Sequence, residues 1–182
     1  MPEPLPTGDL VFDTTCGLYL AATGHDYLLA ERYGGRAYFS NEAIKEMRRG
    51  EISHGHNCAS LLRADWWREL SIHEVEDLIL FNGLLSRWGA VDRNRGEAAA
   101  IVLARRMNCT AIVDDRQGRN AAAGLGVRYT GTVGILACIA ADGRLTVAGA
   151  WQIHQDIVNL GFRSPMHSIE TFALMVQKVR SN

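Results

Sequence analysis

The sequence predicts an α/β protein, a three-layer α/β/α sandwich with a central, mainly parallel sheet. Short apolar segments alternate with longer amphipathic segments along most of the chain, which is the pattern of strands joined by crossover helices. No internal repeat interrupts the alternation, and proline is confined to the two ends of the chain. The 182 residues can bury one substantial core, so we expect a single domain over residues 1–182.

Cap and turn residues divide the first half of the chain into elements. The strand in DLVFDTT ends at Asp13, and Gly24 interrupts the helical pattern that follows it. Ser40 is expected to cap the next helix and Gly50 to end it. The expected elements are a strand at 9–13, a helix at 18–30, a strand at 36–40, a helix at 41–50 and a segment compatible with a strand at 61–70.

The second half of the chain shows the alternation more regularly. Ser71 and Glu74 have the spacing of a capping box, and Gly89 should end the helix that they begin. The expected elements are helices at 71–89 and 95–108, a strand at 109–115, a helix at 116–126, a strand at 127–131 and a helix at 132–143. This repeated order of strand and helix favours parallel strands with helices on both faces of the sheet.

Charge, hydropathy and cysteine content exclude several classes of protein. The formal net charge of −1 provides no bulk field for nucleic acid, so binding of a polyanion would need a local patch or a metal ion. No apolar run reaches the ~18 residues of a membrane span, and MPEPLPTGDL lacks the features of a signal peptide. We therefore expect a cytoplasmic protein without a membrane partner. The four scattered cysteines predict reduced, packed thiols rather than disulfides.

Two clusters in the middle of the chain invite a functional interpretation. SHGHNC contains His54, His56 and Cys58, but a second ligand pair at zinc spacing is missing, so a solvated loop is the preferred interpretation. The adjacent Trp66 and Trp67 need burial or a partner. We expect core packing or a dimer face rather than stacking on bases, because consecutive strand residues face opposite ways.

Two adjacent carboxylates, Asp114 and Asp115, follow the apolar strand residues AIV. One aspartate here can cap the next helix, but capping does not explain a second one, because like charges repel. Asp13 ends another strand. Ligands bind at the carboxyl ends of the strands in parallel sheets, so these side chains converge on one cleft if the two strands are neighbours.

Two glutamates are further candidates, and each has a purely structural alternative. Glu97 stands three residues after Asn94, so the two could form a capping box. Gly96, however, removes side-chain bulk beside Glu97, which suits a crowded site. Glu46 falls on the flank of the apolar face of the helix at 41–50, where a solvated charge would give the same pattern.

The order of these acids along the chain resembles that of the PIN-domain ribonucleases, in particular their VapC-toxin-like branch. The resemblance extends from about residue 9 to 175 and rests on LVFDTTCGLYLAATG, NEAIKEM, GEAAAIVLA, AIVDDRQGRNAAAGLGV, GTVGILACIAADG and LGFRSP. It implies a PIN-like fold and a metal-dependent endoribonuclease that uses Mg²⁺ or Mn²⁺. The acids that it implies as catalytic are Asp13, Glu46, Glu97, Asp114 and Asp115.

Hard divalent cations prefer oxygen ligands, and the resemblance implies Asp13, Glu97, Asp114 and Asp115 as the residues around the metal. Asp114 directly follows the apolar strand and should lie nearer to Asp13, as the inner ligand. Asp115 stands one step further on, where capping of the next helix or contact through water is natural. The family pattern can be aligned with either aspartate.

The resemblance also implies RNA as the substrate, a cognate antitoxin protein as a partner, and a homodimer. Arg116 and Arg119 stand at the start of the helix after the acids, where they could hold RNA phosphates. Arg116 could instead pair with aspartates in a structural role.

Three alternatives to a toxin ribonuclease remain from the sequence. The first is a DNA- or RNA-processing nuclease of the same fold without an antitoxin. The second is a catalytically silent PIN-like interaction module, which has no need for so many acids at strand and helix ends. The third is a dinucleotide-binding protein, which would need a glycine-rich turn after the first strand, where DTTCG stands instead.

Overall fold

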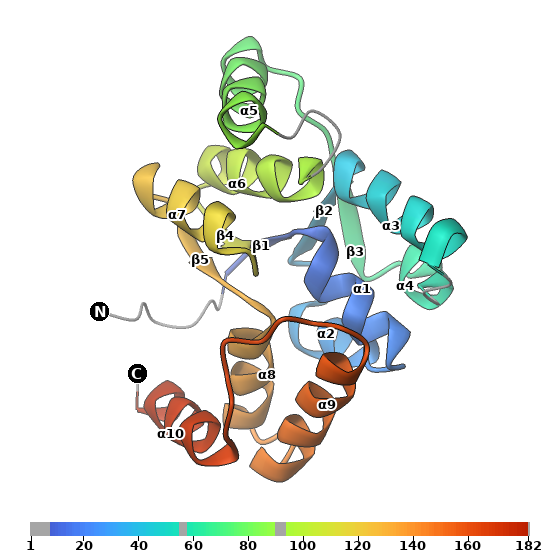
Figure 1. Cartoon of the computed structure of the whole chain (residues 1–182), viewed down its shortest axis with the longest axis vertical. Helices are drawn as coiled ribbons and strands as arrows, with labels where there is room; N and C mark the ends of the chain where they lie inside the picture. Colours follow the sequence, from blue (N-terminus) through green and yellow to red (C-terminus); the bar gives the residue numbers. More distant parts are fainter. Residues whose placement is uncertain (1–7, 55–57, 90–93, 182) are drawn as a thin grey trace.

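A computed structural model describes residues 8–54, 58–89 and 94–181 of the chain. Its centre is a sheet of five parallel strands in the order β3-β2-β1-β4-β5. Helices cover both faces, so the chain forms a three-layer α/β/α sandwich, as predicted (Figure 1). The strands are β1 (Leu10–Phe12), β2 (Ala37–Ser40), β3 (Trp67–Leu70), β4 (Thr110–Ile112) and β5 (Arg128–Thr130).

The helices divide between the two faces of the sheet. Above the sheet in Figure 1 lie α5 (Val75–Trp88), α6 (Arg95–Met107) and α7 (Arg116–Gly124). The elements packed into the other core are α1 (Thr14–Ala22), α2 (Tyr27–Tyr33), α3 (Asn41–His54), α4 (Ala59–Arg63), α8 (Thr132–Ala141), α9 (Val147–Asn159) and α10 (Ile169–Arg180).

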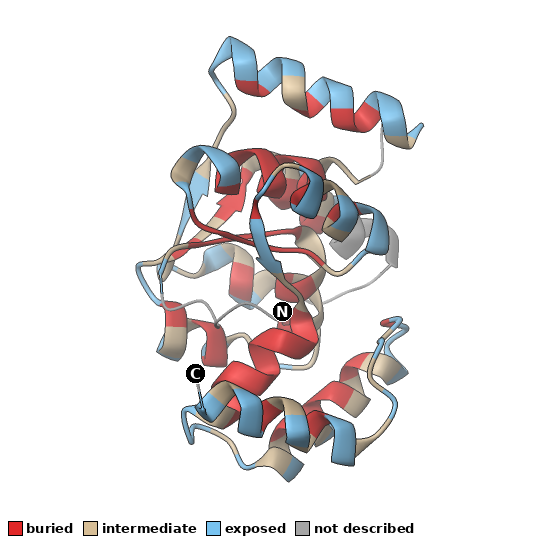
Figure 2. Cartoon of the chain, turned by 90° about the vertical axis from the view of Figure 1, so that its left-hand side faces the viewer, coloured by how far each residue is buried: buried red, intermediate tan, exposed pale blue. Residues whose placement is uncertain are grey.

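The side chains of β1 point alternately into two hydrophobic cores, one on each face of the sheet. Leu10 and Phe12 pack into the core with α1, α2 and α8, while Val11 between them packs into the core with α5 and α6. All three side chains are fully buried, because successive strand residues point to opposite faces of a sheet that is covered on both sides. Figure 2 shows the buried residues on the sheet and on the helix faces turned toward it, with α5 as an outer, largely exposed helix.

Several predicted helix boundaries are wrong. Gly50 does not end its helix, since α3 continues to His54; one glycine costs a helix only about 1 kcal/mol. The helix expected from Ser71 begins at Val75 without a side-chain cap, although it ends at Gly89 as predicted. In contrast, Ser40 caps α3 as predicted, since its Oγ accepts the Ala43 N–H at 3.0 Å.

Other predicted elements differ in extent, and two were missed. The pattern at 18–30 divides into α1 and α2, with Gly24 in the left-handed conformation (φ +73°) between them. Of the segment at 61–70, only Trp67–Leu70 is a strand, and α4 precedes it. The two C-terminal helices α9 and α10 were not predicted, although each begins at a side-chain cap, Thr146 and Ser168.

The tryptophan pair packs into the core, as one of the two expectations held. Both rings meet Phe39 edge to face, with centroid distances of 6.4 Å for Trp66 and 5.4 Å for Trp67. They can do so although they are adjacent because Trp66 precedes β3. The Trp67 Nε1–H also donates to the Leu61 carbonyl at 2.8 Å.

The four cysteines are buried thiols outside any disulfide, as predicted. Cys58 is fully buried, so a wholly solvated loop at SHGHNC is wrong for that residue, while residues 55–57 of the segment lie outside the described residues. Among the described helices, none combines the length and apolar character that a membrane span requires.

Candidate active site

The predicted acids gather at the carboxyl edge of the sheet, where β1 and β4 lie side by side. These strands pair in parallel, with Phe12 opposite Ile112, and the Asp13 N–H donates to the Ile112 carbonyl at 3.0 Å. The chain builds β2 and β3 on one side of β1 and β4 and β5 on the other. The boundary between β1 and β4 is therefore the switch point at which such sheets bind ligands, and Asp13 and Asp114 both follow strands that end there.

Asp13 is almost completely buried, with 3% of its surface exposed. It is the N-cap of α1, and its Oδ1 accepts the Cys16 N–H at 3.3 Å. Burial raises the pKa of Asp13 well above its usual value, and the negative charges of Asp114 and Glu97 raise it further. The carboxylate of Asp13 is therefore costly to ionise unless a cation compensates for its charge.

Asp114 is held by Thr132 at the start of α8. Its Oδ1 accepts the Thr132 N–H at 2.8 Å, and its Oδ2 accepts the Thr132 hydroxyl at 2.6 Å. Burial raises the pKa of Asp114, while the bonds from Thr132 and the charge of Arg119 oppose this rise. A Cβ at Gly131 would stand 2.5 Å from Asp114 Oδ1, so this approach requires glycine.

Glu97 is the least compensated acid of the group. Its side chain is 6% exposed, and its Oε1 is buried without a hydrogen-bond partner. Burial and the nearby charge of Asp115 raise the pKa of Glu97 to about 7, although the Asp115 backbone N–H opposes the rise. Gly118 on α7 lies so close that a Cβ there would collide with the Glu97 carboxyl group.

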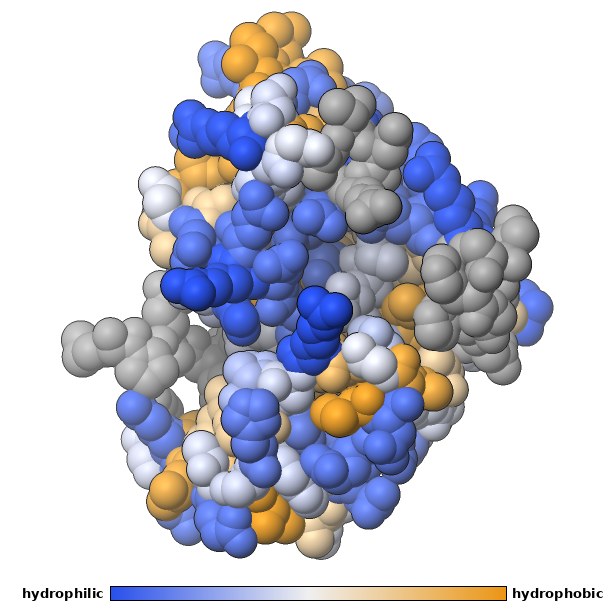
Figure 3. Space-filling view, viewed as in Figure 1, coloured by the Kyte–Doolittle hydropathy of each residue, from blue (hydrophilic) through white to orange (hydrophobic). Residues whose placement is uncertain are grey.

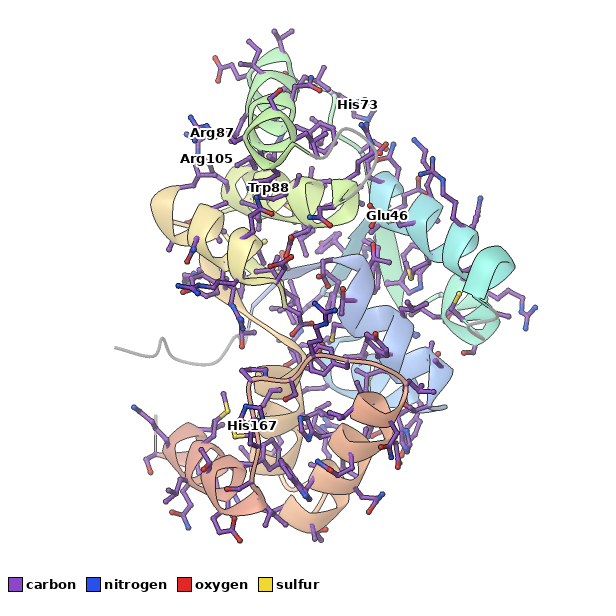
Figure 4. The ribbon with its side chains drawn as sticks, in the orientation of Figure 1. Glu46, His73, Arg87, Trp88, Arg105 and His167 are labelled. Atoms are coloured by element: carbon purple, nitrogen blue, oxygen red, sulfur yellow. The ribbon has the colours of Figure 1, made fainter. Side chains whose placement is uncertain are left out.

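Glu46 lies on α3, and its side chain reaches the start of α6 (Figure 4). Its Oε1 accepts the backbone N–H groups of Arg95 (2.9 Å) and Gly96 (3.1 Å), and its Oε2 accepts the Thr14 hydroxyl at 2.6 Å. Glu46 therefore caps α6 from another helix, and its charge contributes to the raised pKa of Glu97.

The capping box expected at Asn94 and Glu97 is absent. Asn94 is in the left-handed conformation (φ +58°) and makes no side-chain cap bond. The space at Gly96, which the sequence suggested as room beside Glu97, is used by Glu46 instead. A Cβ at Gly96 would stand 2.7 Å from Glu46 Oε2 and 2.5 Å from Thr14 Oγ1.

The two adjacent aspartates have different environments. Asp115 is exposed and is the N-cap of α7, since its Oδ1 accepts the Gln117 N–H at 3.0 Å. Asp114 is the aspartate whose charge raises the pKa of Asp13. This arrangement agrees with the expected order, in which Asp114 lies nearer to Asp13 and Asp115 caps the helix. Their roles as inner and outer metal residues stay predictions.

The two candidate arginines lie on the first turn of α7. Arg119 is partly buried and lowers the pKa of Asp114, which places its guanidinium in the field of the acids. Arg116 is exposed. Hydrophilic residues cover the middle of the face shown in Figure 3, over α7 and below it. Binding of phosphates by these arginines remains a prediction.

Sequence reasoning missed the residues that hold the acids in place. Thr14 and Thr132 stand in DTT and GTVG, each at the first position of a helix, where a hydroxyl can bond to a neighbouring carboxylate. Tyr19 on α1 was also missed. Burial and then the charge of Asp114 raise the pKa of Tyr19. Its ring meets that of Phe162 edge to face, with the ring centroids 5.5 Å apart. The stretch LGFRSP therefore packs against α1, the helix that begins directly after Asp13.

The acids fit a divalent cation held by few direct ligands. Within residues 8–54, 58–89 and 94–181, the Asp, Glu, His and Cys side chains do not form a ready-made group of three around one metal position. Mg²⁺ keeps several waters and often takes only one or two carboxylates directly. The unpartnered Glu97 Oε1 and the buried Asp13 supply such oxygens, and both carboxylates are short of positive charge.

Comparison with known proteins agrees with this geometry. A family model described as a PIN domain matches residues 9–176, which is nearly the whole chain. No curated protein matches the sequence. The chain belongs to the PIN-domain family, a family of nucleases.

Proposed function

We propose that this protein is a metal-dependent endoribonuclease that hydrolyses RNA phosphodiester bonds with the help of Mg²⁺ or Mn²⁺. The observation that carries the proposal is the buried Glu97 Oε1 without a partner, in the field of the buried Asp13 and the half-buried Asp114. An orphaned carboxylate oxygen among like charges is unfavourable in a purely structural site. In a cation-binding site this oxygen would bind the cation, and the positive charge would offset the repulsion between the acids.

In this proposal Asp13, Glu97 and Asp114 hold the cation, and Asp115 contacts it through water. A bound divalent cation lowers the pKa of a water molecule and stabilises charge on the phosphoryl oxygens. The protein itself supplies the positions of its oxygens: Thr132 fixes both oxygens of Asp114, and Asp13 is fixed at the start of α1.

Two further groups of residues would act on the site and on the RNA. Glu46 joins α3 to α6 and thereby positions the turn that carries Glu97. Arg116 and Arg119 would hold phosphates of the RNA at the start of α7, where the free N–H groups of a helix also favour anions. They would provide the local positive charge that the net charge of −1 does not.

A nuclease assay on a mixed RNA pool tests the proposal. The wild-type protein should cleave in Mg²⁺ or Mn²⁺ and not in EDTA. Asp13→Asn should fold normally, because asparagine caps a helix as well as aspartate does, and it should lose most of the cleavage and bind Mn²⁺ more weakly. Glu69→Gln, an exposed change on the edge strand β3, is the matched control. Full cleavage by Asp13→Asn would exclude the assignment.

We also propose that the protein is a cytoplasmic toxin of a toxin–antitoxin pair, of the VapC-like branch. The support is the resemblance of GEAAAIVLA through GTVGIL to that branch. The antitoxin would occupy the acidic cleft, for example with an arginine that replaces the charge of the cation. Expression in a bacterium should slow growth unless the partner is co-expressed. Normal growth with abundant soluble protein would favour a processing nuclease or a silent module.

Finally, we propose that the protein forms a homodimer through α5. Val75, Leu78 and Ile79 are exposed on this helix, and apolar residues cover the top of the face shown in Figure 3. Such patches mark interaction surfaces. The helix begins with the acid Glu76 and ends with Arg87, so two antiparallel copies related by a two-fold axis would oppose unlike charges.

A further inference from the structure

A cavity of about 320 Å³ lies between the end of α5 and the outer side of α7. It is at the small end of the range for ligand pockets, so it suits a group the size of one nucleotide rather than a longer segment. Figure 4 shows Arg87 and Trp88 at this end of α5. The lining residues that matter here are Leu84, Arg87, Trp88, Gln117, Asn120 and Leu125.

The lining has the chemistry of a nucleobase site. Trp88 is half-buried against the core above the sheet, so its indole is held in place while part of it faces the cavity. Gln117 and Asn120 are exposed amides on α7, and each amide can donate and accept hydrogen bonds, as the edge of a base requires. Arg87 adds a cation at the rim.

The absence of acids from this lining separates the cavity from the acidic site. Among the described residues that line it, none carries a carboxylate, although Asp114 and Asp115 directly precede α7 in the chain. Gln117 lines the cavity, whereas its backbone N–H donates to Asp115. The next residue, Gly118, packs against Glu97. One turn of α7 therefore joins the acids to the cavity.

We propose that the cavity between α5 and α7 is a subsite for one unpaired base of a single-stranded RNA, a few nucleotides or less from the phosphate at the acids. This inference rests on the proposed ribonuclease function and adds a specificity-determining site to it. The base stacks on Trp88, and its edge bonds to Gln117 and Asn120. Unpaired bases are the parts of RNA that proteins recognise in this manner.

Binding of short RNAs tests the subsite. The probes are fluorescein-labelled five-nucleotide RNAs of A, C, G or U with phosphorothioate linkages that resist cleavage, and a five-residue strand of the same backbone without bases. Anisotropy gives the dissociation constants of the wild type and its variants. Trp88→Leu should weaken binding of the preferred RNA about 5- to 100-fold. Trp88→Phe, which keeps an aromatic ring, should change it little.

Two controls keep the test independent of folding. Trp151→Leu removes another half-buried tryptophan, on α9 in the opposite layer, and should not affect binding. The double variant Gln117→Glu and Asn120→Asp changes exposed side chains only and should weaken binding of the intact RNA at least fivefold. The strand without bases should bind equally to the wild type and to Trp88→Leu, because it has no base that could stack on Trp88.

Equal binding of the intact RNA by the wild type and by Trp88→Leu would overturn the subsite, even where the wild type cleaves RNA. So would an equal loss on the strand without bases, or no binding by the wild type at all. Conversely, a wild type that binds through Trp88 but fails to cleave in Mg²⁺ and Mn²⁺ would support the subsite and remove the nuclease function. The two failures are therefore distinguishable.

Discussion

The buried carboxylate of Glu97 should make the metal-free protein less stable as the pH rises. The pKa of Glu97 is about 7 in the folded chain, against 4.5 for an ordinary glutamate. Between these values the folded state binds more protons than the unfolded state, so the free energy of unfolding falls with increasing pH. The contribution is complete below pH 4.5 and lost as the pH passes 7. Glu97→Gln removes the charge and should remove this dependence.

The two pKa values set the size of the effect. They correspond to about 3 kcal/mol between the two protonation states of Glu97. For a chain of this length, 1 kcal/mol shifts the melting temperature by about 2–4 °C. In EDTA at pH 8, Glu97→Gln should therefore melt up to about 10 °C above the wild type. Near pH 4 the two should melt within a few degrees of each other, because Glu97 is then protonated.

Urea unfolding in EDTA from pH 4 to 8 measures the difference directly. Glu69→Gln is the control, since this exposed glutamate lies on the edge strand β3, which β2 separates from β1. Saturating Mn²⁺ should stabilise the wild type at pH 8 more than it stabilises Glu97→Gln. Parallel curves for the wild type and Glu97→Gln across the whole range would show that Glu97 does not titrate as the structure requires.

Three other variants test separate parts of the site and surface. Asp114→Asn should lose Mn²⁺ affinity, whereas Asp115→Ala should mainly lose about 1 kcal/mol of stability through its helix cap; calorimetric titration and melting curves compare them, and the reverse pattern would exchange their roles. Gly118→Ala should displace Glu97 and weaken Mn²⁺ binding about 10- to 100-fold in the same titration, with wild-type affinity as the contrary result. Ile79→Glu should convert a dimer to monomers in sedimentation, and an unchanged mass would remove α5 from the interface.

The order of strands and helices was predictable because it depends on local patterns. The apolar segment before Asp13 and the one before Asp114 are each a strand, as predicted. The helix expected from residue 116 begins there, at the cap Asp115, whereas the helix expected from residue 18 begins at Thr14, directly after Asp13. The sequence did not predict that these two strands are neighbours in the sheet, because the pairing joins residues about a hundred positions apart. The helices α9 and α10 have regular caps and apolar faces, and here the signal was present but not used.

The details of the site depend on contacts that no local pattern contains. Asn94 and Glu97 have capping spacing, yet the cap of α6 comes from Glu46, about fifty residues earlier in the chain. Likewise, Gly118 needs to be glycine because Glu97 packs against it. A sequence motif indicates which residue types are present, but tertiary packing decides which of them meet.

The carboxyl edge of the sheet carries more acids than the capping of its helices requires. Four helices begin at the same edge of the sheet, and their first N–H groups are satisfied by acids, which is favourable for negative charge. These bonds join Asp13 to Cys16, Glu46 to Arg95 and Gly96, Asp114 to Thr132, and Asp115 to Gln117. At the two local N-caps, Asp13 and Asp115, a neutral serine or asparagine would cap the helix nearly as well, so capping alone does not require these charges. Glu97 accepts the Asp115 backbone N–H but leaves its Oε1 without a partner. The charge that this edge holds beyond what its caps need is therefore the part that a cation would neutralise.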